Sequence, residues 1–410
     1  MTHYDVIVVG AGPAGASLSI HLAGAGVRVL LVESKRFPRP KLCGEFITPE
    51  CLTHFARLGV ETEISAAGGT RVAETIFYSA QGRSVSIPSQ WFGSAGQMAL
   101  GLSRAEMDAR LLQRAREVGV EVLEETSASN LIVEDERVSG VRLKSVDGVR
   151  EARAFVTVDG TGRARVLAKQ VDAKRRSVNE TSFGDAAAKK RSPLVAFKAH
   201  FEDVRNIDDR CEIYFYKGGY GGLSPVEAGR SNLCFIVAAS QVRACGSDAE
   251  RVMREVVMRN EQANSMLRDA RRVSPWLSVA LQSFGRSEIA PSEGLLTIGD
   301  AASFVDPFTG SGMLMALESG ELAAASIARW LPRLRRNEGF SLLAADYEAQ
   351  YNSKFERRLR LCALLRRAAF APQFTHEVAI IALGLSNTSV RRKLARATRQ
   401  TLHTPFKANI

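Results

Sequence analysis

One stretch near the N-terminus constrains the fold more than any other part of the chain. Residues 6–9 are apolar and β-branched, which is typical of a strand buried on both faces of a sheet. A turn of spacing GxGxxG follows, with its glycines at Gly10, Gly12 and Gly15, and then a stretch with the length of a helix. The next apolar run ends on Glu33. This order of strand, glycine-rich turn, helix and acid-terminated strand predicts a dinucleotide-binding βαβ unit.

Each glycine of the turn has its own expected task. Gly10 permits the tight turn, Gly12 lets the backbone approach a pyrophosphate, and Gly15 lets the helix pack closely on the sheet. The helix N-terminus would direct its free N–H groups at the phosphates. The carboxylate of Glu33 would accept hydrogen bonds from the ribose hydroxyls. This stretch alone is compatible with either NAD or FAD.

Length and composition are those of an ordinary soluble protein. With 410 residues, the chain can bury a large core and divide into two or three domains. Its longest apolar run, residues 378–385, is far shorter than the roughly 20 residues of a membrane span. Because the start of the chain also lacks a signal-peptide pattern, we expect a cytoplasmic protein. The six cysteines and six histidines show no metal-ligand or CxxC spacing, so we expect no disulfide framework and no metal.

Positive charge is concentrated toward the C-terminus. Residues 351–410 hold 12 Lys and Arg against two acids, in a chain of net charge +11. A basic tail can contact the anionic inner face of a membrane, or it can simply be a solvated helical face. Aromatic residues do not alternate with these charges, so we expect no nucleic-acid partner.

The segment after Glu33 is predicted to be a loop, because it contains Pro38, Pro40 and Gly44. Basic residues precede Cys43 in this loop, where they could help to hold a diphosphate and place the thiol near a redox centre. Nearby positive charge would favour the thiolate. A linker with a buried cysteine is the other interpretation of the same residues.

Several local patterns predict single elements. A capping box at residues 103–106 predicts the start of a helix. Residues 131–133 and 138–143 are typical of the two strands of a hairpin. Residues 167–193 are basic and weakly apolar, which predicts a loop.

Two later apolar runs end on a glycine and an acid, at Asp159-Gly160 and at Gly299-Asp300. Such residues at the carboxyl end of a parallel strand fall where α/β sheets bind ligands. A turn rich in glycine follows the second run, and residues 313–331 then form a long helix. The N-terminus of that helix is a second anion-binding end.

With these motifs the chain resembles the FAD-dependent oxidoreductases of the para-hydroxybenzoate hydroxylase superfamily, and within it the geranylgeranyl reductase-like branch. The resemblance extends to about residue 330. Its motifs are GxGxxG with Glu33, Arg104 in the capped helix, Asp159-Gly160, and Gly299-Asp300 followed by Pro307 and Gly310-x-Gly312. The returning strand and helix decide for FAD, because NAD proteins of the Rossmann type do not need them.

The resemblance implies roles for individual residues. The expected cofactor-binding residues are Gly10, Gly12, Pro13, Ala14, Gly15, Glu33, Ser34, Cys43, Gly44, Arg104, Ala128, Asp159, Gly160, Asp300, Pro307, Gly310, Gly312 and Met313. The expected substrate-pocket residues are Tyr214, Tyr220, Gly222 and Phe304. Cys43 matches the cysteine that lies close to the flavin in this branch, and it is a candidate catalytic residue. Glu45 is a candidate acid or base if it is buried, and otherwise a solvated loop acid.

The implied fold is α/β, or α+β overall, of the glutathione reductase 2-like type found in para-hydroxybenzoate hydroxylase. We expect a Rossmann-type FAD-binding domain of residues 1–75, 100–170 and 285–335, and a mixed-sheet substrate domain of residues 76–99 and 190–284. A basic helical region, residues 336–410, would follow. Only one dinucleotide fingerprint is found, so NAD(P)H would bind transiently if it reduces the flavin.

The reaction on a hydrophobic small molecule stays open between two types. The Cys43-Gly44 pair favours a reductase of C=C bonds, with flavin reduced by NAD(P)H or another donor. The Tyr-x-Trp-x-Phe-Pro motif of the branch is replaced by residues 220–225, without the Trp and the Phe, which favours a monooxygenase that hydroxylates an aromatic or polyketide-like compound. The same stretch lacks the Trp-x-Trp-x-Ile-Pro of flavin halogenases. A membrane-docked flavoprotein electron carrier is the third interpretation, and the sequence leaves the oligomeric state open.

Overall fold

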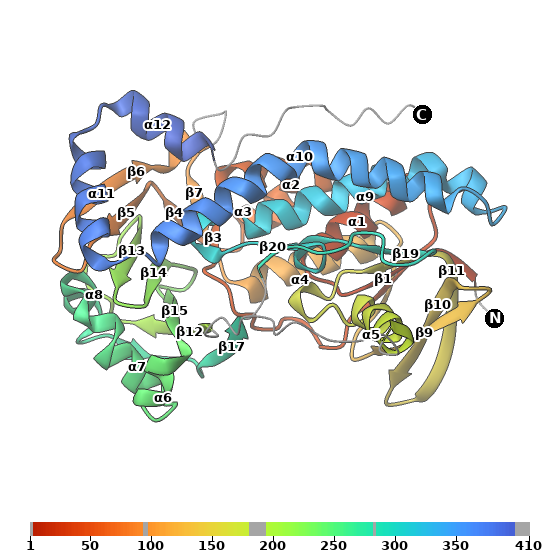
Figure 1. Ribbon diagram of the computed structural model, residues 1–410, viewed down its shortest axis with the longest axis horizontal. Helices are drawn as coiled ribbons and strands as arrows, with labels where there is room; N and C mark the ends of the chain where they lie inside the picture. Colours follow the sequence, from red (N-terminus) through yellow and green to blue (C-terminus); the bar gives the residue numbers. More distant parts are fainter. Residues whose placement is uncertain (1–2, 93–96, 180–193, 282–283, 398–410) are drawn as a thin grey trace.

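Two β-sheets and the helices around them organise the chain (Figure 1). The computed structural model describes residues 3–92, 97–179, 194–281 and 284–397. The first sheet has the strand order β8-β2-β1-β11-β10-β9, with β19 beside β11. Its strands are β1 (His3–Val9), β2 (Val29–Val32), β8 (Glu121–Leu123), β9 (Ser127–Glu134), β10 (Arg137–Ser145), β11 (Gly148–Asp159) and β19 (Leu295–Thr297).

The centre of the first sheet is parallel, as the continuous apolar runs predict. Strand β1 lies between β2 and β11, and β8 and β19 extend the parallel part. Along β1, Val6 and Val8 face the helices, whereas Ile7 and Val9 face the ribbon of β9 to β11. The β9–β10 pair is antiparallel, which confirms the predicted hairpin.

The second sheet has the order β16-β12-β15-β14-β13-β5-β6, with β17 beside β12. Its strands are β5 (Glu74–Tyr78), β6 (Ser84–Pro88), β12 (Leu194–Glu202), β13 (Arg210–Tyr216), β14 (Gly219–Pro225), β15 (Ser231–Ala238), β16 (Arg271–Arg272) and β17 (Leu277–Leu281). One face packs against α6 (Ala239–Ala244), α7 (Ala249–Glu255) and α8 (Glu261–Leu267). Because side chains alternate along a strand, the other face is left to meet the rest of the molecule.

Short elements join these sheets. They are α2 (Pro49–Leu58), α3 (Glu61–Ser65), the small sheet of β3 (Phe46–Ile47), β7 (Ala99–Gly101) and β4 (Thr70–Val72), the pair β18 (Gly285–Arg286) and β20 (Ser303–Phe304), and the 3-10 turns η1 (Ser89–Trp91), η2 (Gly162–Ala164), η3 (Val257–Arg259), η4 (Gly299–Ala301) and η5 (Pro307–Thr309).

Helix α1 (Pro13–Gly24) packs between α4 (Arg104–Glu117) and α9 (Gly312–Leu334). The approach to α9 is close: a Cβ added to Gly320 would lie 2.4 Å from the carbonyl oxygen of Ala14. The Ser17 hydroxyl also donates a hydrogen bond of 2.9 Å to the carbonyl of Leu317, 300 residues away. Helix α1, near the start of the chain, is therefore held against a helix that comes after the strands of both sheets in the sequence.

The capping box at the start of α4 is half formed. The Ser103 hydroxyl accepts a hydrogen bond of 3.2 Å from the backbone N–H of Glu106, as predicted. The Ser103 backbone N–H, however, donates to Glu227 at 2.8 Å. Glu106 pairs with Arg110 instead, so the second half of the box is supplied by a residue distant in sequence.

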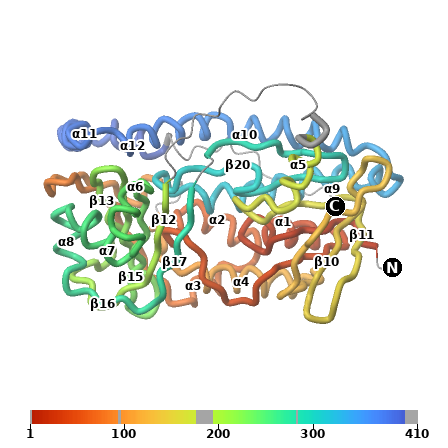
Figure 2. The backbone as a smooth tube through the Cα atoms, turned by 60° about the horizontal axis from the view of Figure 1, so that its bottom comes forward, coloured from red at the N-terminus to blue at the C-terminus, as the bar shows by residue number. Residues whose placement is uncertain are grey.

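The C-terminal region is helical, as expected. Helix α10 (Phe340–Ala369) lies along α9, and α11 (Gln373–Leu385) and α12 (Thr388–Ala397) turn back over β6 at the end of the molecule opposite the N-terminus (Figure 2). Among the described helices, no single one is long and apolar enough to cross a membrane. Only α10 and α11 taken together pass that test, and they are bent by 117° at their junction.

The predicted loop at residues 167–193 is wrong in its first part, where α5 (Ala168–Asn179) forms. The helix start is held from a distance, because the carboxylate of Asp159 accepts hydrogen bonds of 2.9 Å from the backbone N–H groups of Leu167 and Ala168. A local reading of residue types misses such a cap. The remainder of that prediction, residues 180–193, lies outside the described residues.

Candidate active site

A cavity of about 880 Å³ opens between the two sheets, at the carboxyl ends of β1 and β2. It extends from the glycine-rich turn, past the loop of residues 39–46, to α11 and α12. Parallel α/β sheets bind nucleotides at this edge. The cavity volume is near the upper end of the range of about 300–1,000 Å³ that is usual for small-molecule sites.

The glycines of the first turn divide into two kinds. A Cβ on Gly10, which has φ +104°, would lie 2.4 Å from the carbonyl oxygen of Gly160, and one on Gly15 would lie 1.9 Å from that of Gly10. These two glycines are required by the fold itself. A Cβ on Gly12 would meet only Arg104 within 4 Å among the described residues, at 3.9 Å from Nη2. The space in front of Gly12 is therefore available to a ligand at the N-terminus of α1.

The acid at the end of β2 is held in a fixed orientation. Glu33 accepts hydrogen bonds from the backbone N–H groups of Ala11 and Lys35, at 3.1 and 3.0 Å. The guanidinium of Arg39 lies 3.4 Å from the same carboxylate. Among the described residues, Nε and Nη1 of Arg39 are buried without a hydrogen-bond acceptor, although Nη1 lies 3.5 Å from Asp108. This arrangement leaves donors for an anion.

Further cations line this part of the cavity. Arg104 makes two hydrogen bonds of 2.8 Å to Asp108, one turn along α4. Burial would lower the pKa of Arg104, but the charge of Asp108 raises it overall. Burial raises the pKa of Asp300, which faces the cavity, although Arg163 and Arg104 act in the other direction. Lys41 also lines this part of the cavity.

These residues fit a dinucleotide. The turn leaves room for a pyrophosphate, Arg39 and Arg104 supply positive charge, and Glu33 is oriented for a ribose. From the other side, the start of α9 brings Gly310, Gly312 and Met313 to the cavity. The site is thus closed by two helix N-termini, α1 and α9, each of which favours negative charge.

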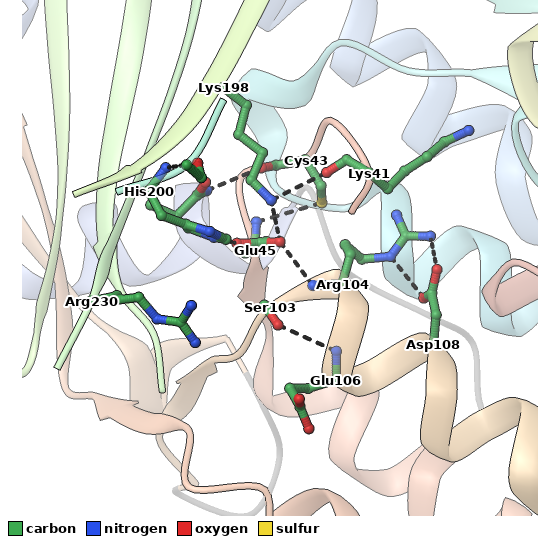
Figure 3. A network of polar contacts seen from close by, with 12 residues as sticks. Lys41, Cys43, Glu45, Ser103, Arg104, Glu106, Asp108, Lys198, His200 and Arg230 are labelled. Atoms are coloured by element: carbon green, nitrogen blue, oxygen red, sulfur yellow. Dashed lines mark hydrogen bonds and ion pairs between the residues drawn. The ribbon is translucent and has the colours of Figure 1, made fainter. Parts of the chain in front are cut away.

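Glu45 occupies an unusual place beside this site (Figure 3). It is fully buried at 0% exposure, and its φ of +55° is in the left-handed region that non-glycine residues rarely adopt. Its carboxylate is hydrogen-bonded to His200 Nε2 at 2.7 Å, ion-paired with Lys198, and accepts the backbone N–H of Arg104 at 2.8 Å. Burial would raise the pKa of Glu45, but the hydrogen bond from His200 and the charge of Lys198 lower it overall, so the group is ionised.

This cluster, Glu45 with Lys198 and His200, fixes the Cys43-Gly44 pair on the cavity wall. The backbone N–H of Glu45 lies 3.5 Å from the Cys43 sulfur, and the Lys198 ammonium also donates to the carbonyl of Lys41 at 3.2 Å. The free thiol of Cys43 is half-buried and faces the cavity. Three separate segments therefore meet at one carboxylate: the loop, the start of α4, and β12 of the second sheet.

Beyond Cys43 the cavity becomes an apolar chamber. One wall is the inner face of the second sheet, and the other is formed by α10 and α11. Its apolar lining includes Phe77, Val85, Ile87, Phe92, Ile213, Phe215, Phe308, Leu361, Leu365, Ile380 and Leu383. Within it, the hydroxyl of Tyr220 donates a short hydrogen bond to Asp306. Burial, reinforced by Asp306, raises the pKa of Tyr220 well above its ordinary value, so its proton is retained.

Most of the predicted site residues line this one cavity. They are Gly10, Gly12, Pro13, Ala14, Glu33, Ser34, Cys43, Gly44, Glu45, Arg104, Ala128, Gly160, Asp300, Pro307, Gly310, Gly312, Met313, Tyr220, Gly222 and Phe304. Residues far apart in the sequence, such as Glu33 and Met313, are thereby brought to one site.

Three predicted residues lie outside it. Tyr214 is fully buried on the opposite face of β13, because Ile213 and Phe215 take the cavity side of the alternating strand. Asp159 is also fully buried, and its carboxylate is used to hold the start of α5. Gly15 contributes through the packing of α1 on the turn and has no place on the cavity wall.

Lys198 and His200 were missed by the sequence analysis. A signal for them exists, because Lys198 and His200, at spacing i, i+2, share one face of strand β12 and follow four apolar residues. The contribution of α10 and α11 to the apolar chamber was missed as well. In the sequence, their apolar residues look like those of any core helix, because the packing of α11 over β6 is a long-range contact that the sequence does not reveal.

A comparison with protein families matches residues 3–333 to the family described as FAD binding domain. Among curated proteins, the chain is similar to digeranylgeranylglycerophospholipid reductase 2 of Methanopyrus kandleri, with 25% identity over 390 residues, covering 95% of this chain and 92% of the relative. It is also similar to the menaquinone reductase of Mycobacterium tuberculosis, with 29% identity over 410 residues, covering 94% of this chain and 90% of the relative.

Solved structures share the fold. The myxobacterial chondrochloren halogenase gives a TM-score of 0.77 at 21% identity, covering 98% of this chain and 93% of that one. A geranylgeranyl bacteriochlorophyll reductase-like protein of Thermoplasma acidophilum gives a TM-score of 0.71 at 19% identity, with 98% and 93% covered. At these identities the likeness establishes the architecture, in agreement with the expected fold class.

Proposed function

We propose that this chain, which belongs to the FAD binding domain family, is an FAD-dependent oxidoreductase. Its proposed reaction is the reduction of C=C bonds in a long, apolar, lipid-like substrate. The names of its relatives, reductases of a digeranylgeranyl phospholipid and of menaquinone, support a substrate of this class. The FAD would be held by the turn around Gly12, by Glu33 and by the start of α9.

The observation that carries the proposal is the continuity of one cavity. It leads from the phosphate-binding turn, past Cys43, into the apolar chamber between the second sheet and α11. The aromatic residues missing from residues 220–225 are replaced there by Phe77, Phe215 and Phe308, which come from other elements. A long hydrocarbon chain can therefore be accommodated although the aromatic motif is absent.

Bound FAD, reduced by NAD(P)H or another donor, supplies the hydride for such a reduction. Adding a hydride to one carbon of a C=C bond leaves the other carbon in need of a proton. Candidate donors on the cavity wall include the side chains of Cys43 and Tyr220. Tyr220 keeps its proton at neutral pH, because burial raises its pKa, and its hydroxyl donates a hydrogen bond to Asp306.

Glu45 is better suited to positioning than to proton transfer. Its two carboxylate oxygens are occupied by Lys198, His200 and a backbone N–H, and its pKa is lowered. We assign it the task of holding the Cys43 loop against the substrate chamber. This assignment replaces the acid–base role considered for it from the sequence.

The test is an anaerobic turnover of the reduced holoenzyme with a phospholipid that carries geranylgeranyl chains, followed by mass spectrometry. A gain of two hydrogens per double bond supports the proposal. A gain of one oxygen on admission of air would show the alternative, an aromatic or polyketide monooxygenase. Reoxidation by a quinone without any change of the lipid would instead show an electron carrier. Tyr220→Phe, which is expected to keep its FAD, provides the slow variant for comparison.

Peripheral membrane contact through the basic C-terminal region also belongs to this proposal. A lipid-like substrate resides in a bilayer, and residues 351–410, with 12 Lys and Arg against two acids, account for most of the chain's net charge of +11. Anionic lipid headgroups attract such a segment.

A further inference from the structure

Helix α11 is apolar on two opposite faces. Its inner face borders the chamber with His376, Ile380 and Leu383. Its outer face exposes four large apolar residues at helical spacing, which we call the outer stripe: Phe374, Val378, Ile381 and Leu385, at 71, 61, 38 and 84% exposure. Isolated exposed apolar residues are common, but an aligned row on one short helix marks a contact surface.

The single charged residue of α11 faces the protein, although the charged residues of a surface helix usually face solvent. Glu377 turns toward the protein, where it lies 3.7 Å from Arg83 and accepts the backbone N–H of Gln81 at 3.3 Å. The helix is thus anchored to the turn between β5 and β6 through its polar group. Its solvent side is left to apolar side chains.

Helix α12 continues this surface and adds positive charge. Val390 is 43% exposed, and Leu394, one turn later, is 54% exposed and also borders the cavity. Arg392 and Lys393 are exposed beside them. Large apolar side chains flanked by basic ones are the composition of helices that lie in the headgroup region of anionic bilayers. A second protein copy would not explain the basic residues, whereas anionic lipid does.

We propose that the outer stripe and α12 dock on an anionic lipid bilayer and that α11 is the partition between the bilayer and the chamber. The substrate then reaches the chamber by passing around α11 without crossing water. This inference rests on the proposed function, because it supplies the route for a lipid-like substrate. It locates the contact in an apolar helix face and does not depend on the charge of the tail alone.

The experiment is flotation of the full-length holoprotein with vesicles of phosphatidylcholine and phosphatidylglycerol. Val378→Ser/Leu385→Ser removes two residues of the outer stripe, neither of which lines the chamber. Its matched control is Val146→Ser/Val149→Ser, two exposed valines at 94 and 62% exposure near the β10–β11 turn, at the other end of the molecule. Arg392→Glu/Lys393→Glu tests the charge. Flavin content checks that each variant is folded.

We expect the wild type and the control to float, with binding weakened by salt, and the stripe variant to lose binding at least about tenfold. The charge variant should lose the dependence on anionic lipid. Equal flotation of the stripe variant, or no flotation of the wild type, would overturn the proposal. Loss of self-association by the stripe variant in ultracentrifugation, with no vesicle binding by any form, would assign the surface to a second copy instead.

Turnover separates this inference from the proposed function. The stripe variant should reduce a vesicle-embedded lipid at least about tenfold more slowly than the control, while both reduce a detergent-dispersed short-chain analogue equally well. Reduction of the analogue without flotation would refute the docking and leave the function intact. Flotation without reduction of either substrate would refute the function and leave the docking intact.

Discussion

Replacing Gly12 with valine is expected to leave the protein folded and to abolish FAD binding. The backbone at Gly12 is extended, with φ −70° and ψ −178°, which valine adopts without strain. The nearest described atom to an added Cβ is Arg104 Nη2, at 3.9 Å. The new methyl groups would therefore meet no protein backbone and would fill the space in front of α1.

The size of the effect follows from what that space holds. A pyrophosphate at the N-terminus of α1 accepts charge-assisted hydrogen bonds, each contributing about 1.5–3 kcal/mol. Displacing two of them costs about 3–6 kcal/mol, or about 10²–10⁴ in Kd. The apo-protein should lose only about 1 kcal/mol, because valine is a poorer N-cap than glycine.

The assay is the FAD released per protein after purification, together with the thermal midpoint with and without added FAD. Gly24→Val is the matched control, because a Cβ at Gly24, near the end of α1, has no described atom within 4 Å. Gly15→Ala is the opposite case, since its Cβ would lie 1.9 Å from the Gly10 carbonyl and should unfold the protein. A full complement of FAD in Gly12→Val would refute the placement of the cofactor.

Cys43→Ala should retain FAD and lower steady-state turnover by about 10²–10⁴ if the thiol donates the proton; unchanged turnover would make it a wall residue only. Lys198→Met leaves the buried Glu45 short of a cation and should destabilise the fold by about 3–5 kcal/mol in urea unfolding, and Lys198→Met/Glu45→Gln should recover part of that loss; a double variant less stable than the single one would contradict the pairing. Burial alone would raise the pKa of Glu321, but the hydrogen bond from His54 lowers it overall, from 4.5 to about 2. Since one pKa unit is about 1.4 kcal/mol, this contributes on the order of 3 kcal/mol above pH 4.5, which is lost as the pH falls toward 2. Glu321→Gln should therefore flatten the acid side of the stability profile, and an unaltered profile would speak against the pair.

The nucleotide-binding unit could be predicted because its signals are local. Apolar runs, fixed glycines and the acid Glu33 lie within the first 33 residues, and each acts through its own preference or through its immediate neighbours. The late pair Gly299-Asp300 carries the same local signature. The structure accordingly brings both to one cavity.

The Glu45 cluster could not be predicted in the same way. Its members are some 150 residues apart, and whether a loop acid is buried or solvated depends on which strand passes over it. Tyr214 was misplaced for a related reason: alternation along β13 gives two candidate faces, and only the packing of α8 on one of them decides which is the cavity side. Long-range packing, which residue preferences do not encode, settles both cases.

The close contact between α1 and α9 can form only late in synthesis on the ribosome. Ser17 is made 300 residues before its acceptor Leu317, a delay of about 15–60 s at about 5–20 residues per second. Through that interval the apolar side of α1 has to be shielded by something other than its native partner. The far wall of the nucleotide site, at the start of α9, is also missing until then. We therefore expect flavin to be captured only after α9 has been made, so that a chain truncated before α9 should stay colourless.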